Sequence, residues 1–123
     1  RSTPSNSSAA SDVYKRQVGN KEGYFKYYPN NTDEHEDCKY QIFKKLKKEG
    51  YQVWTECNFS DGSGRADIIC ISKEGNGYII EVETPKSEKE YKMKTLSKEN
   101  YPKEFELIIV NTGDFEIDSF EIV

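Results

Sequence analysis

The feature that most constrains the fold is a run of four apolar residues, Leu107, Ile108, Ile109 and Val110. Successive side chains of a β-strand point to opposite faces of its sheet, so this run is apolar on both faces. Such a strand suits a sheet that is covered on both sides, which is typical of sheets flanked by helices. The run therefore predicts an α/β fold with a buried strand over residues 106–110.

Periodic segments elsewhere supply the other layers of this fold. Ile42, Phe43 and Leu46 form an apolar stripe at helical spacing, which predicts a helix from near Asp33 to a stop at Gly50. Strands are predicted over residues 51–57, 65–72 and 78–83, a second helix over residues 87–100, and an added edge strand over residues 115–123. The order αβββαβ predicts a mixed central sheet flanked by helices.

The N-terminal residues differ in composition from the rest. Residues 1–17, RSTPSNSSAASDVYKRQ, are polar and lack any period, and SSAASDVYKRQ looks like translated sequencing adapter. The alternative for these residues is a disordered natural tail. Residues 18–32 are expected to form an N-terminal extension with a short strand over 24–28 and a turn at 29–31. The domain itself is predicted to span residues 33–123.

The composition limits the classes of function. The net charge is −4, and an acidic chain is not an obvious DNA binder, because affinity for phosphates comes from Lys and Arg. Carboxylates that hold a metal would account for part of this acid. The three cysteines contain no CxxC pair, which argues against a zinc site or a disulfide framework. We see no membrane-length apolar stretch and no secretory segment, so the expected location is cytoplasmic and without a membrane partner.

Three acidic residues lie inside otherwise apolar strands. Asp67 lies in the predicted strand 65–72, and Glu81 and Glu83 flank Val82 in the strand 78–83. Burial of an ionised carboxylate is costly unless it is paired or bound to a metal. A three-residue turn at 74–76 would pair Asp67 with Glu83 on one face, whereas a four-residue turn would place Asp67 opposite Val82 unless a bulge corrects it.

Three carboxylates on one patch repel one another unless a cation lies among them. Hard oxygen ligands of this kind suit Mg²⁺ or Mn²⁺, and such an ion can activate water and stabilise charge on a phosphate. The alternative is that the three side chains are solvated at a strand end. The pattern therefore indicates a candidate metal site formed by Asp67, Glu81 and Glu83.

With these acids, and with a preceding helix that carries Glu36, the chain resembles the PD-(D/E)XK nuclease superfamily over residues 33–111. This superfamily includes restriction endonucleases, archaeal Holliday-junction resolvases and Mrr-like enzymes. The resemblance implies a restriction-endonuclease-like core. In it, Asp67, Glu81 and the carbonyl group of Val82 would hold the metal. Glu36 matches a first-helix glutamate near the metal, although Asp33 and Glu36 also have the spacing of a capping box.

The chain departs from the superfamily pattern at one position. Glu83 stands where the lysine is usual, as in some restriction enzymes that use ExE. Lys86 would supply a displaced ammonium group, or else it is an ordinary surface lysine. His35, the single histidine, is assigned no role. Arg65 and the lysines of the second predicted helix are candidates for phosphate contact, with solvated charges as the alternative. These lysines are Lys86, Lys89, Lys92, Lys94 and Lys98.

The resemblance implies a metal-dependent endonuclease that hydrolyses DNA phosphodiester bonds by in-line attack of water. The missing lysine and the acidic charge favour an alternative, a catalytically inactive nuclease-like domain that binds nucleic acid or a partner protein. A second alternative is an unrelated α/β domain, in which Asp67 and Glu81 would point to opposite faces. Nucleases of this size commonly act as dimers, which adds a homodimer to the expectations.

Overall fold

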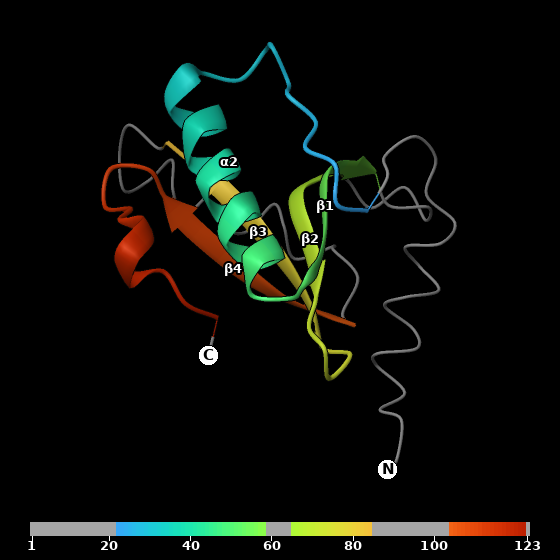
Figure 1. Ribbon diagram of the computed structural model, residues 1–123. Helices are drawn as coiled ribbons and strands as arrows, with labels where there is room; N and C mark the ends of the chain where they lie inside the picture. The colour runs from blue at the N-terminus through green and yellow to red at the C-terminus, as the bar shows by residue number, and fades with distance from the viewer. Residues whose placement is uncertain (1–21, 59–64, 85–103, 123) are drawn as a thin grey trace.

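The computed structural model describes residues 22–58, 65–84 and 104–122 of the chain (Figure 1). Helix α2 (Asp33–Lys48) is followed by strands β1 (Gln52–Asn58), β2 (Arg65–Ile71), β3 (Gly77–Glu83) and β4 (Phe105–Asn111), and by the 3-10 turn η1 (Ile117–Ser119). Within these ranges the strands form a four-stranded sheet in the order β1-β2-β3-β4. Neighbouring strands are antiparallel except β3 and β4, which are parallel, so the predicted mixed α/β fold is confirmed. The second predicted helix, 87–100, lies outside the described residues.

Helix α2 begins and ends where its capping residues require. The Thr32 side chain is the N-cap, and its hydroxyl oxygen accepts a hydrogen bond from the backbone N–H of His35 at 3.1 Å. At the other end Gly50 takes a left-handed φ of 92°, and its N–H donates to the carbonyl oxygen of Lys47 at 3.1 Å. Because Thr32 rather than Asp33 caps the helix, the capping box offered as an alternative role for Glu36 is not formed.

Helix α2 covers one face of the sheet (Figure 1). Its stripe of Cys38, Ile42, Phe43 and Leu46 packs on apolar side chains from all four strands. Those side chains are Val53, Ile68, Cys70, Ile80, Val82 and Val110. Removal of this apolar surface from water is the main force that holds helix and sheet together.

The opposite face of the sheet is also buried. Its apolar side chains are Trp54, Cys57, Ala66, Ile69, Ile71, Ile79 and Phe105. Apolar side chains of the sheet are therefore buried on both faces. The predicted buried strand over residues 106–110 is corrected: in β4, Val110 is buried but Leu107 to Ile109 are only half-buried, because β4 lies at the edge of the sheet that the described residues form.

Two predicted edge elements are wrong. Residues 115–122 form no strand. Instead, Phe115, Phe120 and Ile122 pack against the cluster under α2, and Lys45 of α2 donates a hydrogen bond to the carbonyl oxygen of Ile117 at 3.0 Å. Residues 24–28 run beside β1 without forming a strand, since the N–H of Lys26 donates to the hydroxyl group of Thr55 rather than to a backbone carbonyl.

Among the described residues, no helix has the length and apolar character that crossing a membrane requires.

Candidate functional site

The turn between β2 and β3 sets the register of the predicted acids. It comprises residues 73–75, closed by a hydrogen bond from the N–H of Ser72 to the carbonyl oxygen of Asn76 at 2.9 Å. Gly75 takes a left-handed φ of 91°, a conformation that glycine adopts without strain. The turn is therefore odd in length, as the predicted site requires, but it begins one residue earlier than predicted.

This register aligns Asp67 with Glu81 rather than with Glu83. The last paired residues of the β2–β3 ladder are Ile68 and Ile80, and the next step of the ladder would set Asp67 opposite Glu81. The observed pairing differs from the predicted one by two residues, and a shift of two residues leaves each side chain on the same face of the sheet. The predicted Asp67–Glu83 pairing is therefore corrected, whereas the predicted placement of the three acids on one face is retained.

Beyond Ile68 and Ile80 the two strands form a fork that is occupied by the carboxylate of Asp67. Its Oδ2 atom accepts a hydrogen bond from the backbone N–H of Val82 at 2.8 Å. On its other side β3 remains paired with β4 through Glu81, Val82 and Glu83. The end of β3 that carries the glutamates is thus held by β4 and by the Asp67 side chain.

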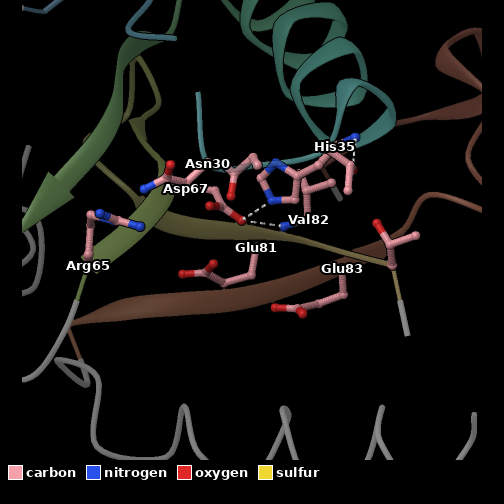
Figure 2. Close-up of a pocket in the computed structure, with 10 residues that line it drawn as sticks. Asn30, His35, Arg65, Asp67, Glu81, Val82 and Glu83 are labelled. Carbon is pink, nitrogen blue, oxygen red and sulfur yellow. Dashed lines mark hydrogen bonds and ion pairs between the residues drawn. The ribbon is translucent and has the colours of Figure 1, made fainter. Parts of the chain in front are cut away.

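The fork opens into a pocket of about 400 Å³ (Figure 2). Its lining consists of Asn30, Asn31, Thr32, His35, Arg65, Asp67, Glu81, Val82, Glu83 and Thr84. In Figure 2, Glu81 and Glu83 project from the same side of β3, and Asp67 lies between Glu81 and His35. All three predicted acids and Val82 therefore share one cavity, which is not what the unrelated α/β domain predicts.

His35 is a pocket residue that the sequence reasoning missed. Its Nε2 atom lies 3.2 Å from Oδ2 of Asp67, and its Nδ1 atom lies 3.2 Å from Oε2 of Glu36. Burial lowers the pKa of His35, but the hydrogen bonds and charges of Asp67 and Glu36 outweigh burial and raise this pKa above its ordinary value. A histidine at the third position of a helix, beside a predicted first-helix glutamate, was the available signal.

These neighbours favour the ionised form of Asp67. Burial raises the pKa of Asp67, yet hydrogen bonds with His35, with the Glu81 side chain and with the N–H of Val82 lower it below its ordinary value. A hydrogen bond between the carboxyl groups of Asp67 and Glu81 needs a proton on one of them. A cation between the two groups would relieve their repulsion equally well.

Next to the pocket lies an ionic cluster that we call the Lys39 cluster, formed by the buried residues Glu36, Lys39 and Glu56 and by Arg65, which also lines the pocket. The Nζ atom of Lys39, which has no solvent exposure, lies 2.7 Å from Oε2 of Glu36 and 2.9 Å from Oε2 of Glu56. Arg65 completes the cluster, with its Nε atom 3.3 Å from Oε1 of Glu56. Two acids and two bases are therefore paired in this cluster, although burial raises the pKa of Glu56.

Glu36 belongs to this cluster and does not line the pocket. Its Oε1 atom accepts a hydrogen bond from the N–H of Tyr28 at 2.7 Å, and its Oε2 atom accepts one from the Asn31 side chain at 2.9 Å. Burial raises the pKa of Glu36, but hydrogen bonds from Lys39, Tyr28 and Asn31 more than offset this and lower it. The structure therefore places Glu36 behind His35. The other predicted residue, Lys86, lies outside the described residues.

The donor set of the pocket suits a divalent cation. Asp67, Glu81 and Glu83 offer hard oxygen ligands, which Mg²⁺ and Mn²⁺ prefer. Arg65 is already paired with Glu56, so these carboxylates leave the pocket negatively charged. As the side chains stand, no three His, Cys, Asp or Glu residues of the described ranges are arranged as a metal site. The chemistry of the donors thus fits such an ion, without a ready coordination geometry.

The fold and the pocket define this chain as a mixed α/β domain with an acidic pocket at one end of its sheet. A family described as "Competence protein CoiA, nuclease-like domain" matches residues 31–101, which is more than half of the chain. The chain therefore belongs to the CoiA nuclease-like family. The match covers α2, β1, β2 and β3 and every residue of the pocket lining except Asn30. No curated protein and no solved structure matched the chain.

Proposed function

We propose that this domain is a metal-dependent nuclease that hydrolyses phosphodiester bonds of DNA, with a core of the PD-(D/E)XK type. Membership of a nuclease-like family supports this function. The observation that carries the proposal is the gathering of Asp67, Glu81 and Glu83 in one pocket at the fork between β2 and β3. Carboxylates brought together in this way are costly without a cation, and a cation among them is suited to phosphate chemistry.

The proposed metal is Mg²⁺ or Mn²⁺, held by Asp67, Glu81 and the carbonyl oxygen of Val82. Such an ion lowers the pKa of a bound water and stabilises negative charge on a phosphate. All three of these residues line the pocket. The N–H of Val82 and the ring of His35 hold the Asp67 carboxylate from two directions, which limits its rotation.

Glu83 takes the role of accepting a proton from the attacking water in this proposal. It lines the pocket on the same strand face as Glu81, at the position where the superfamily usually carries lysine. A carboxylate can act as a general base where a lysine ammonium can only orient the water or the phosphate. Lys86 remains a candidate for that second task, and it lies outside the described residues.

The test is nicking of supercoiled plasmid by the purified protein with Mg²⁺ or Mn²⁺, compared with EDTA. Wild-type protein should nick DNA only with the metal, and Asp67→Asn and Glu81→Gln should each abolish the activity. Glu106→Gln is the matched control, because Glu106 is an exposed carboxylate on β4 away from the pocket lining. Nicking in EDTA, or equal nicking by Asp67→Asn and Glu106→Gln, would contradict the proposal.

A second candidate function is binding of nucleic acid or a partner protein without cleavage. The glutamate at position 83, in place of the usual lysine, favours it. This candidate predicts DNA or partner binding by the wild-type protein with no metal-dependent nicking under any of these conditions. The plasmid assay therefore separates the two functions directly.

A further inference from the structure

Arg65 lines the pocket and contacts both Glu56 and Tyr28. Its side chain is 41% exposed, and its Nε atom lies 3.3 Å from Oε1 of Glu56. The centre of its guanidinium group lies 4.2 Å from the ring centroid of Tyr28, which is a stacking distance. The guanidinium plane is therefore held by an acid and by an aromatic ring.

In Figure 2, Arg65 lies towards one end of the pocket and Glu83 towards the other, with Asp67 and Glu81 between them in this view. The pocket thus combines an exposed, oriented cation with a group of acids. A phosphodiester bound between Arg65 and a metal at the acids would be contacted by a positive charge on each side.

Glu56 achieves its contact with Arg65 through an unusual backbone. It has a φ of 52° inside β1, a left-handed conformation that non-glycine residues rarely adopt. Thr55 pairs with Ile68, which belongs to the cluster on the helix side, and Cys57 belongs to the cluster on the opposite face. The left-handed step turns Glu56 to the helix side as well, where Lys39 and Arg65 can reach it.

Lys39 fixes the far side of the Glu56 carboxylate. Its buried Nζ atom is 2.9 Å from Oε2 of Glu56, while Arg65 contacts Oε1. Because Lys39 is also held by Glu36 at 2.7 Å, neither carboxylate oxygen of Glu56 can move without disturbing the cluster. A strained backbone that is maintained by surrounding contacts is typical of functional sites.

We propose that Arg65 binds a phosphate group of the nucleic acid at this pocket and that Glu56 is its positioning residue. The inference rests on the proposed function and adds a phosphate-binding residue to it. The planar guanidinium group carries five N–H donors, and its fork matches two phosphate oxygens at once. The Nε side of the group forms the ion pair with Glu56, and in this proposal the Nη groups donate to the phosphate. In this role the orientation of the guanidinium group matters as much as its charge.

The experiment measures binding of a fluorescein-labelled DNA duplex by fluorescence anisotropy in EDTA, where no metal-dependent cleavage occurs. Arg65→Gln should weaken binding about tenfold and reduce the slope of log affinity against log salt by about 1. Arg65→Lys should show most of the same loss, because lysine keeps the charge but lacks the planar guanidinium group that stacks on Tyr28 and offers two parallel donors. Lys73→Gln, in the turn at the opposite end of β2, removes an exposed positive charge and should stay within about twofold of wild type.

Glu56→Gln separates positioning from simple charge. Removal of an acid near bound DNA should strengthen binding if only net charge matters, whereas loss of the positioning contact should weaken it several-fold. Thermal unfolding verifies that the variant is folded. Tyr28→Leu removes the ring that stacks on Arg65 and leaves the side chains of the Lys39 cluster in place, so it tests the same orientation if Glu56→Gln does not fold. It should also weaken binding.

The inference is overturned if wild-type protein shows no DNA binding, if Arg65→Lys binds as wild type does, or if folded Glu56→Gln binds more tightly. Its failure is distinct from failure of the proposed function. Metal-dependent nicking that requires Asp67, together with wild-type binding by the Arg65 variants, would remove only this inference. DNA binding that depends on Arg65, without any nicking, would support this inference and remove only the catalytic proposal.

Discussion

The imidazole ring of His35 and the carboxylate of Asp67 meet across the fork, with Nε2 of His35 3.2 Å from Oδ2 of Asp67. The same oxygen accepts the N–H of Val82 at 2.8 Å. One contact comes from the first turn of α2 and the other from β3, so the helix and two strands converge on a single carboxylate. The orientation of Asp67 therefore depends on the docking of α2.

Replacement of His35 should impair catalysis without unfolding the domain. Residues that orient a metal-binding carboxylate typically contribute roughly ten- to hundredfold to metal affinity or activity. We expect His35→Ala to reduce plasmid nicking by this order, with partial recovery as the Mn²⁺ concentration is raised. Asp37→Asn, an exposed change on the same helix, is the control. Nicking by His35→Ala at the wild-type rate at every Mn²⁺ concentration would exclude this role.

The pair should also give the fold a pH-dependent stability. Burial lowers the pKa of His35, but Asp67 and Glu36 raise it above its ordinary value. The contribution of His35 to the stability of the fold is therefore complete below its unfolded pKa of about 6.5 and is lost as pH rises through its folded pKa. The pKa of Asp67 is lowered despite burial, so its contribution is present above about 3.9 and is lost as pH falls through its folded value.

The difference in free energy of unfolding between wild type and His35→Gln should therefore be largest from about pH 4 to 6.5. Urea denaturation in EDTA at about pH 5.5 and about pH 8 measures this difference, which should be smaller at the higher pH. A difference that is equal at the two pH values, or larger at the higher one, would show that the pair does not stabilise the fold in this way.

Lys39 should be among the most sensitive positions for stability. Its ammonium group is fully buried between Glu36 and Glu56, so Lys39→Met would leave two buried carboxylates without their shared cation. Removal of one partner of a buried ion pair typically costs about 3–5 kcal/mol, whereas Lys48→Met, an exposed change on the same helix, should stay within about 0.5 kcal/mol. Chemical denaturation measures both. Equal stabilities of the two variants would contradict the importance of the Lys39 cluster.

The cysteines should be unreactive in the folded protein. Cys38, Cys57 and Cys70 are buried at 4%, 2% and 0% exposure. Burial raises the pKa of Cys38 to about 12 and raises that of Cys70 as well, so little thiolate is present at neutral pH. Mass spectrometry after iodoacetamide treatment should detect no labelling of native protein and three labelled sites after denaturation. Rapid native labelling of any of the three would indicate local opening of the core.

Local patterns predicted the four strands of the sheet and the shared face of the three acids, but not the structure of residues 24–28 and 115–122. Asp67, Glu81 and Glu83 interrupt apolar strands, and a short hairpin brings the two strands together, so their common phase follows from strand periodicity. The pairing itself was predicted two residues out, because the left-handed Gly75 ends the turn rather than lying at its centre. Small differences in backbone preference can move a turn by one residue along the chain. The alternation of apolar and polar side chains does not reveal such differences.

The residues around the acids were harder to predict because they come from elements far apart in the sequence. Lys39 lies among apolar residues on the buried side of α2, and this interruption of the apolar stripe was a sign of a buried cation. Its partner Glu56 could not be assigned from the sequence, because a regular strand would not turn Thr55 and Glu56 to the same side. The C-terminal segment was predicted as a strand on apolar content alone, although Phe115 and Phe120 pack on the helix side.

The parallel pairing of β4 with β3 bears on where this domain can be truncated for expression. Glu81, Val82 and Glu83 pair with Ile109, Val110 and Asn111, whereas the family match stops at residue 101, before β4 begins. A recombinant fragment that ends with the match would retain every acid of the pocket yet lose the backbone ladder that supports two of them. For this chain, the boundary of an expressed fragment is better set by that ladder than by the extent of sequence similarity.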